Sequence, residues 1–406
     1  MGTEQKEVGT QGEPSAPLVY LDHSATTPVR PEVVDAMLPF LRESFGNPNS
    51  AYSLGQKARR AVEQARGEVA ALVGAADPAE IVFTSGGSEA DVLAIAGGAW
   101  GAFDQSKGVR RRLVSSRVEH DAVRGILGQL NKRGFSTALA GVDASCRVCV
   151  AEAAALITPE TALVSIMHAN NEVGTVQPVA ELAAAAREKG ALFHTDAVQS
   201  AGKLEIDVQK LGVDLLALSG HKLNAPKGVG ALFVRKGVRL APVITGHQEK
   251  NRRGGTENVA GIVGLGTACA LARKELSAHA VQLEALRQKL TVEVLKIPGS
   301  RLNGADSGRL ASCAHFSFEG IDGHSLVVAL DLEAICVSSG PACSTGIAEP
   351  SHVLTAMGLD ASIAAGSIRV SLGWSSSGAD IDRLLAALPG AVERLRRVPA
   401  KAGGKA

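Results

Sequence analysis

Short apolar runs alternate with helical patterns along much of the chain. The runs are rich in Val, Ile, Leu and Phe, as expected of buried strands. In the segments between them, apolar residues recur every three or four positions, as on one face of a helix. Near-continuous apolar strands separated by helices predict an α/β fold with a doubly wound, mainly parallel sheet. The predicted strands are 81–84, 113–116, 162–167, 192–194, 215–218 and 230–234, and the predicted helices are 53–73, 88–99, 123–133 and 179–189.

The pattern changes near residue 258, where long helical stretches replace the alternation. This change predicts a smaller C-terminal α/β domain, to which the N-terminal segment could also contribute. The predicted division is a disordered arm 1–17, a large domain 18–257, a small domain 258–398 and a disordered tail 399–406. The elements predicted for the small domain are helices 257–274 and 279–296, a strand 311–318, a helix 322–331, a strand 334–337 and a helix 379–396.

Polar residues cluster where the predicted strands end. Ligands of doubly wound sheets bind beyond the carboxyl ends of the strands, so these clusters mark the expected site. They are Ser85-Gly86-Gly87-Ser88, Glu119-His120, Asn170-Asn171, Asp196 and Ser219-Gly220-His221-Lys222.

Lys222 has two interpretations, a surface cation or a Schiff-base lysine with a desolvated amine. Asp196, with Gln199 three residues on, could bind a ribose, a metal or a pyridinium nitrogen. No acidic residues group with Asp196 at metal-ligand spacing, and no Walker-type loop accompanies it. A carboxylate 4 Å from a pyridinium contributes about 4 kcal/mol at an effective dielectric of 20. That pairing keeps such a ring electron-withdrawing, which favours pyridoxal phosphate as the cofactor.

A phosphate would also need a binding site. The segment 85–88 lies between a strand and a helix, where glycines allow close approach and free N–H groups attract an anion. Together with Ser219 and His221, it forms a plausible phosphate cup. His120 has a common structural interpretation and a functional one, in which it stacks on the ring and transfers protons.

Composition narrows the function class. Lys plus Arg total 42 and Asp plus Glu total 41, so the formal charge of +1 gives no case for a nucleic-acid or membrane partner. No run of 18 apolar residues is present, and residues 1–17 lack the features of a secretion signal or transit peptide, which predicts a cytoplasmic protein. Six cysteines are too few for a disulfide scaffold, and we interpret Cys146 and Cys149 as ordinary apolar side chains without a metal.

Ten ordered motifs resemble those of the cysteine desulfurases, which are fold-type I, class V pyridoxal-phosphate enzymes. The similarity runs from about residue 19 to about residue 396, nearly the whole chain. The motifs are LDHSATTP (21–28), GNPNS (46–50), FTSGGSEAD (83–91), VEHDAV (118–123), HANNEVG (168–174), HTDAVQS (194–200), SGHK (219–222), GGTEN (254–258), SSGPACS (338–344) and SIRVSLG (367–373).

The resemblance implies a role for each matched residue. Lys222 would hold pyridoxal 5′-phosphate covalently, Asp196 would pair with the ring nitrogen, and Gln199 would bind the ring hydroxyl. His120 would stack on the ring and act as an acid–base. The phosphate would be held by Gly87, Ser88, Ser219 and His221, and by Thr256 from the partner subunit of a homodimer. The L-cysteine substrate, next to the cofactor, would be held by Asn171 and by a bidentate Arg369.

Cys343 would be the nucleophile of such an enzyme. It lies in a stretch rich in Gly, Ser and Pro, 338–346, which predicts a mobile loop carried by the small domain. Its thiolate would take sulfur from L-cysteine as a persulfide and leave L-alanine. The longer form of this loop resembles the housekeeping and nitrogen-fixation subgroup, which implies delivery to an acceptor such as an iron–sulfur scaffold or a tRNA-thiolation factor.

Several residues depart from the family pattern. Ser88 stands where Thr is usual and Val92 where Asn is usual. Asn224 and Ala225 replace Tyr and Gly, and 245–251 replaces a glycine-rich segment. Three other functions stay open from the sequence: a selenocysteine lyase, an aminotransferase or kynureninase-like class V enzyme, and a non-catalytic binding platform. The loop cysteine argues against the second, and retention of Lys222 argues against the third.

Overall fold

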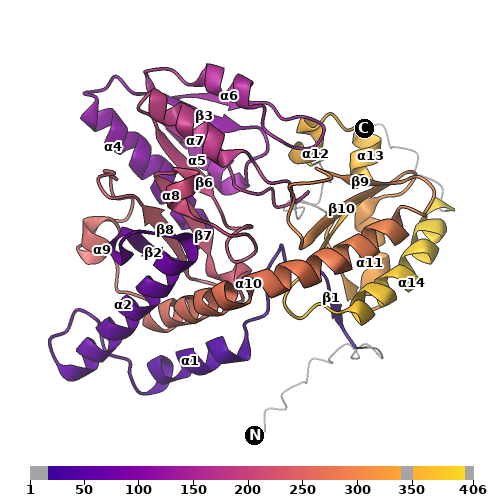
Figure 1. Ribbon diagram of the computed structural model, residues 1–406, viewed down its shortest axis with the longest axis horizontal. Helices are drawn as coiled ribbons and strands as arrows, with labels where there is room; N and C mark the ends of the chain where they lie inside the picture. The colour runs from indigo at the N-terminus through magenta and orange to yellow at the C-terminus, as the bar shows by residue number, and fades with distance from the viewer. Residues whose placement is uncertain (1–16, 340–350, 398–406) are drawn as a thin grey trace, which may run out of the picture.

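A seven-stranded sheet forms the centre of the larger part of the molecule in this computed structural model, which describes residues 17–339 and 351–397 (Figure 1). The strand order is β2-β8-β7-β6-β5-β3-β4. The strands from β7 to β4 are parallel, and β8 is antiparallel to both of its neighbours. The prediction of a mainly parallel sheet is confirmed. The strands are β2 (Ile81–Thr84), β3 (Arg112–Ser116), β4 (Ser136–Ala140), β5 (Thr161–Ser165), β6 (Leu192–Asp196), β7 (Leu215–Ser219) and β8 (Gly230–Val234).

Both faces of this sheet are covered by helices, because successive strand residues point to opposite sides. Leu215 belongs to one buried apolar cluster and Leu216 to another. The first cluster includes residues of α3 (Gly87–Val92), α4 (Gly98–Gln105) and α5 (Asp121–Asn131). The second includes residues of α2 (Ser53–Val73), α6 (Val150–Leu156), α7 (Val179–Glu188) and α8 (Val208–Leu211). The doubly wound architecture is therefore confirmed.

Two predicted helix boundaries are wrong. The stretch 88–99 is interrupted: α3 ends at Val92, a π-helical turn spans Leu93–Gly97, and α4 continues to Gln105. The two helices predicted at 257–274 and 279–296 form one helix, α10 (Val259–Val294). The four residues between the predicted pieces, Glu-Leu-Ser-Ala, contain neither Gly nor Pro, so nothing in that stretch breaks the helix.

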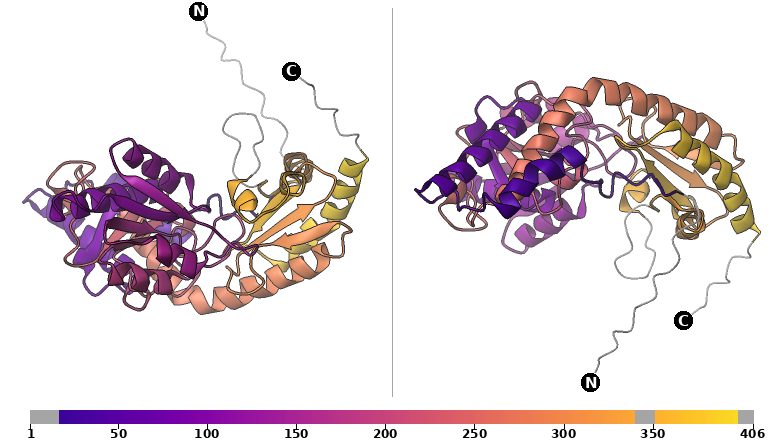
Figure 2. Two further views of the ribbon diagram at one scale, coloured as in Figure 1. Left: turned by 90° about the horizontal axis from the view of Figure 1, so that it is seen from above. Right: turned by 90° about the horizontal axis from the view of Figure 1, so that it is seen from below.

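Helix α10 joins the two parts of the molecule (Figure 2). It contacts α1 (Pro31–Arg42) and α2 beside the large sheet, and α14 (Gly378–Arg396) and β10 beside the smaller one. The side chain of Asn258 caps its first turn by accepting a hydrogen bond from the Gly261 N–H at 3.1 Å.

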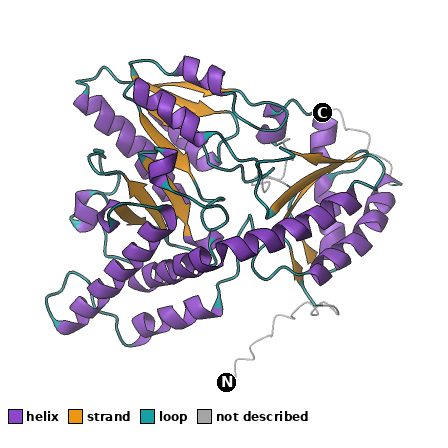
Figure 3. Cartoon of the chain, in the orientation of Figure 1, coloured by secondary structure: helices purple, strands orange, loops and turns teal. Residues whose placement is uncertain are grey.

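The smaller part contains a three-stranded antiparallel sheet, β12-β10-β9, covered by helices (Figure 3). Its strands are β9 (Ser300–Asn303), β10 (Cys313–Phe318) and β12 (Ser367–Ser371), and its other helices are α11 (Gly323–Asp331), α12 (His352–Ala356) and α13 (Ala361–Ala365). A two-stranded parallel sheet pairs β1 (Val19–Tyr20) with β11 (Ile335–Cys336). Val19 and Leu21 pack in the apolar cluster of the smaller part, which includes residues of β10, β12 and α14. The domain limits stay a prediction, and the tail 399–406 and residues 1–16 of the arm lie outside the described residues.

In the described part of the chain, no helix has the length and apolar content needed to cross a membrane.

Candidate active site

One cavity of about 520 Å³ lies where the carboxyl ends of β3, β5, β6 and β7 meet the smaller part of the molecule. Side chains that are far apart in the sequence line it together, as the strand-end rule predicts. The predicted site residues among its lining are Gly87, Ser88, His120, Asn171, Asp196, Gln199, Ser219, His221, Lys222 and Arg369.

Lys222 ends a short 3₁₀ turn, Gly220–Lys222, that follows β7 directly. Its Nζ donates hydrogen bonds to the carbonyl oxygens of Ser24 and Ala25, in the LDHSATTP segment. Burial, followed by the charges of Lys203 and Arg369, lowers the pKa of Lys222 to about 7. A large fraction of this amine is therefore neutral, and so nucleophilic, near neutral pH.

Asp196 is the last residue of β6 and is 7% exposed. Its Oδ1 accepts a hydrogen bond from the Val198 N–H at 2.8 Å. Burial raises its pKa, while the charges of His120 and Lys222 oppose that rise. A buried carboxyl of this kind favours a cationic partner, such as a protonated ring nitrogen.

Gln199 lies three residues further on. Its Nε2 donates to the Ser24 carbonyl oxygen at 3.0 Å, and its Oε1 accepts from Lys203 at 3.4 Å. These contacts fix the Gln199 amide beside Lys222. The role of this amide in binding a ring hydroxyl stays a prediction.

Gly87 begins α3 and packs closely against the strand ends. A Cβ at this position would lie 2.7 Å from Val198 Cγ2 and 3.2 Å from Ser219 Cβ, so a larger residue would not fit. Ser88 and His221 line the same corner of the cavity. Burial and the neighbouring lysine charges lower the pKa of His221 to about 4, so its ring is neutral at physiological pH. This corner offers backbone and side-chain donors for an anion.

His120 is the N-cap residue of α5, and its Nδ1 accepts a hydrogen bond from the Ala122 N–H at 3.2 Å. In the neutral ring, the proton is therefore on Nε2. The N-cap contact fixes the orientation of the ring at the cavity wall.

Arg369 comes from β12 and is 5% exposed. Its Nη2 donates to Asp22 Oδ1 at 2.8 Å and its Nη1 to the Asn171 carbonyl oxygen at 2.9 Å. Asn171 therefore contributes its backbone to holding this guanidinium, and it also lines the cavity. A planar cation at this wall matches a carboxylate ligand.

Five ionisable lining residues were not singled out from the sequence: Asp22, Asp91, Asp121, Glu172 and His352. Glu119, from the predicted Glu119-His120 cluster, is not part of the lining, and its Oε1 accepts from Ser116 Oγ and the Met167 N–H. Burial raises the pKa of Asp91, with further contributions from the charges of Asp196 and Glu119. Nε2 of His352 contacts the Glu119 carbonyl oxygen at 3.0 Å, which a ring nitrogen can do only as a donor. Strand-end position did indicate Glu119 from the sequence, whereas only the fold brings His352 to this wall.

Two predicted site residues are not among the residues that line this cavity. Thr256 lines a separate cavity of about 110 Å³ with Gly255, Arg253 and Glu249. Cys343 lies outside the described residues. Cys146 is buried and Cys149 is exposed, and both are free. Within residues 17–339 and 351–397, no group of His, Cys, Asp and Glu side chains could hold a metal ion.

Two of the departures from the family pattern have a structural explanation. Asn224 has a left-handed backbone with φ of 61°, which Asn tolerates well, and its Nδ2 donates to the Pro28 carbonyl oxygen at 3.0 Å. In the segment 245–251, Glu249 forms a two-pronged ion pair with Arg66, at 2.7 and 2.9 Å. Val92 packs against the apolar cluster of α3 to α5, and nothing in the structure replaces the missing amide.

Comparison with known proteins agrees with this geometry. Residues 19–384 match the aminotransferase class-V family. The chain is 46% identical over 381 residues to a cysteine desulfurase IscS of Methanosarcina thermophila, covering 94% of this chain and 93% of the relative. It is 45% identical to a cysteine desulfurase of Gluconacetobacter diazotrophicus, covering 94% of each. A solved structure titled as a NifS-like protein superposes with a TM-score of 0.86 at 36% identity, covering 93% of this chain and all of that one.

The fold and the site define a pyridoxal-phosphate enzyme of the doubly wound type. The chain belongs to the aminotransferase class-V family, and its relatives within that family are cysteine desulfurases.

The residues present fit the cofactor of this family. A lysine with a lowered pKa, a buried carboxyl and a glycine-lined anion corner line one cavity. These are the three features that a phosphorylated pyridine aldehyde needs: an amine for the aldehyde, a counter-charge for the ring nitrogen and donors for the phosphate. Lys222, Asp196 and the corner of Gly87, Ser88, Ser219 and His221 would hold it.

Proposed function

We propose that the protein is a pyridoxal-phosphate-dependent cysteine desulfurase, which converts L-cysteine to L-alanine and transfers the sulfur to Cys343. The observation that carries the proposal is one cavity lined by Lys222, Asp196 and Arg369, in a chain 46% identical to a cysteine desulfurase. Bound pyridoxal phosphate supplies an electron sink that stabilises negative charge at the substrate α-carbon.

The chain's own residues would prepare the site for that chemistry. Asp196 is buried, and a cationic ring nitrogen beside it would stabilise its carboxylate. Lys222 supplies an amine that is partly neutral near pH 7, so it could accept a proton from the bound substrate. His120, with its Nδ1 held by the Ala122 N–H, presents its other ring nitrogen for proton transfer.

Arg369 would orient the substrate through its α-carboxylate. The guanidinium is already fixed by Asp22 and the Asn171 carbonyl oxygen, so little conformational entropy is lost when a ligand binds. Its Nε has no hydrogen-bond partner among the described residues. The arrangement supports binding of an amino acid with its carboxylate toward β12.

Sulfur transfer would need the thiolate of Cys343. The thiolate attacks the substrate sulfur, an S–S bond forms and the substrate C–S bond breaks. The electron pair of the broken bond leaves with the carbon skeleton, which is released as alanine after protonation. Reduction of the resulting persulfide, or its transfer to an acceptor thiol, regenerates Cys343.

We also propose that the enzyme is a cytoplasmic homodimer. Thr256 lines a cavity separate from the active site of its own chain, which supports its predicted contribution to the partner's phosphate site. Large exposed apolar side chains on and after α1 support a buried surface there: Val34, Leu41, Phe45 and Tyr52. Sedimentation analysis tests this, since a monomer at micromolar concentration would exclude it.

The sulfur acceptor is proposed to be a protein, such as an iron–sulfur scaffold or a tRNA-thiolation factor. The support is the likeness to enzymes named IscS and NifS-like. Transfer of labelled sulfur from the charged enzyme to a purified scaffold tests this. Label that stays on the desulfurase in the presence of every candidate acceptor would contradict it.

The function itself is tested by incubating the purified holoenzyme with L-cysteine and a reductant, and measuring alanine and sulfide. We expect equal amounts of both, and neither from Lys222→Ala. Lys227→Ala is the matched control, because Lys227 is exposed and lies outside the cavity lining. Alanine from selenocysteine but not from cysteine would instead indicate a selenocysteine lyase.

A further inference from the structure

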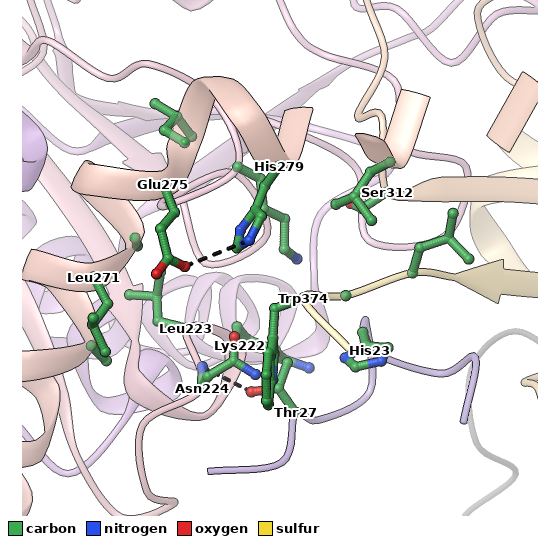
Figure 4. A pocket seen from close by; sticks show the side chains of 18 of the residues that line it. His23, Thr27, Lys222, Leu223, Asn224, Leu271, Glu275, His279, Ser312 and Trp374 are labelled. Atoms are coloured by element: carbon green, nitrogen blue, oxygen red, sulfur yellow. Dashed lines mark hydrogen bonds and ion pairs between the residues drawn. The ribbon is translucent and has the colours of Figure 1, made fainter. Parts of the chain in front are cut away.

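A second cavity, which we call the back cavity, lies behind Lys222 (Figure 4). It has a volume of about 60 Å³, and Lys222 is part of the lining of both this cavity and the active site. One wall is apolar and comes from α10, with Ala268, Leu271 and Leu276 among its residues. The opposite side is polar and comes from the segments around His23, Ser312 and Trp374.

Four buried polar atoms of the lining have no hydrogen-bond partner among the described residues: both ring nitrogens of His23, Oγ of Ser312, whose residue is 2% exposed, and Nε1 of Trp374. Burial lowers the pKa of His23 to about 4, so its neutral ring has one donor and one acceptor nitrogen. An indole N–H can only donate, and a hydroxyl can donate. Because buried polar groups are nearly always paired, the indole N–H and the Ser312 hydroxyl indicate that something in the back cavity accepts hydrogen bonds.

The charges around the back cavity are mostly positive. Lys203, Lys222 and Arg30 line it, against one acidic residue, Glu275. The carboxylate of Glu275 is already engaged, since its Oε2 lies against the Arg30 guanidinium and 3.5 Å from His279 Nε2 (Figure 4). Among the described residues, the hydrogen-bond acceptor of Lys203 is Gln199 Oε1, at the long distance of 3.4 Å. The site therefore holds more donors and positive charge than its own acceptors can match.

We propose that the back cavity binds a small monovalent anion, held by Ser312 and Trp374 and attracted by Lys203. A water molecule needs roughly 10–15 Å³ of such volume, so about 60 Å³ admits a halide ion with accompanying water. The apolar wall formed by α10 lowers the local dielectric on that side, which strengthens the attraction between the anion and Lys203.

The consequence is a second binding site next to the catalytic lysine, between the helix that joins the two parts of the molecule and the segment after β12. The inference does not depend on the proposed desulfurase activity, because occupancy is measured without substrate.

Bromide is the probe, used in two measurements on the holoenzyme. In the first, crystals soaked in bromide are examined for anomalous scattering. In the second, bromide quenching of Trp374 fluorescence is followed in a Trp100→Phe background, where Trp374 is the single tryptophan left of the two in the sequence. We expect an anomalous peak in the back cavity and quenching that saturates.

Ser312→Ala removes one donor and is expected to raise the half-saturating bromide concentration about fivefold to tenfold. Ser375→Ala is the matched control, since Ser375 adjoins Trp374 but is exposed and absent from the lining, and it should leave the midpoint unchanged. No anomalous peak in the cavity would overturn the proposal, as would quenching that stays linear or is equal in both variants. If Ser312→Ala does not fold, the crystal measurement on the unaltered chain decides.

Discussion

Asp22 and Arg369 lie 347 residues apart in the sequence and form a partly buried ion pair, with Oδ1 and Nη2 at 2.8 Å. The side chains are 18% and 6% exposed. The contact joins the segment after β1 to Arg369 on β12. The Asn171 carbonyl oxygen, in the segment after β5, accepts a second hydrogen bond from the same guanidinium. The residue proposed to bind the substrate is thus held by three distant parts of the chain.

Replacement of this arginine tests the proposed clamp. Arg369→Lys keeps the charge but loses the planar pair of N–H groups, so we expect kcat/KM for L-cysteine to fall about tenfold to a hundredfold. The visible absorbance of bound cofactor should persist, because Arg369 is not among its proposed ligands. Arg301→Lys, at an exposed position of β9, is the control and should behave as the unaltered enzyme. Equal kinetics for the two variants would remove Arg369 from substrate binding.

The lowered pKa of Lys222 predicts the pH dependence of cofactor binding. Because the folded pKa is about 7 instead of 10.5, the neutral amine accumulates as pH rises through about 7. The rate at which apoenzyme takes up pyridoxal phosphate, followed by visible absorbance, should rise through that pH and then level off. Lys203→Gln should move the midpoint upward, because the charge of Lys203 lowers this pKa. Exposed Lys236→Gln should not move it, and a rate still rising steeply above pH 9 would contradict the assignment.

The two buried aspartates near the proposed ring site should differ in importance. Asp196→Asn removes the counter-charge for the ring nitrogen, and we expect kcat to fall about a hundredfold to a thousandfold. Asp91→Asn should cost less than about tenfold, because burial raises the pKa of Asp91 and so favours its neutral form, which Asn resembles. The measurement is alanine production at saturating L-cysteine. A larger loss for Asp91→Asn than for Asp196→Asn would reverse the assignment.

Arg66 has one buried and one exposed acidic partner, which gives a matched test of stability. Glu249→Gln leaves the buried guanidinium with only the exposed Glu63 as an acidic partner, so we expect a loss of about 3–5 kcal/mol in the free energy of unfolding. Glu63, whose side chain is 58% exposed, also pairs with Arg66, and Glu63→Gln should cost under about 1 kcal/mol. Urea unfolding of the two variants measures the difference. Equal losses would mean that the buried ion pair stabilises the fold no more than the exposed one does.

Much of the large sheet could be predicted because its strands are apolar on both faces. Strands β2 and β8 have the predicted bounds, and β7 differs by one residue. Strand β4, Ser136–Ala140, was missed because its residues are mixed and partly exposed at the sheet edge. Helix α10 was divided because its apolar pattern changes partners along its length, from α1 and α2 to α14, while its backbone continues.

The site residues could likewise be predicted only where a local sequence pattern marks them. Lys222, Asp196 and His120 follow strands, so position alone indicated them. Position also marked Asn171, in the Asn170-Asn171 cluster, but its role was assigned from the family motifs. Arg369 and Cys343 were assigned from those motifs alone. Asp22 and His352 reach the cavity only through contacts between distant segments, and the polarity of their own neighbourhood gives no sign of it.

The most direct test of the account is a single turnover without reductant. The holoenzyme is mixed with excess L-cysteine, released alanine is counted per chain, and the peptide containing Cys343 is weighed by mass spectrometry. We predict a burst of one alanine per chain and one added sulfur atom on Cys343, with both absent in Cys343→Ala. Alanine released by Cys343→Ala at the same rate, or a Cys343 peptide without added sulfur, would contradict the account.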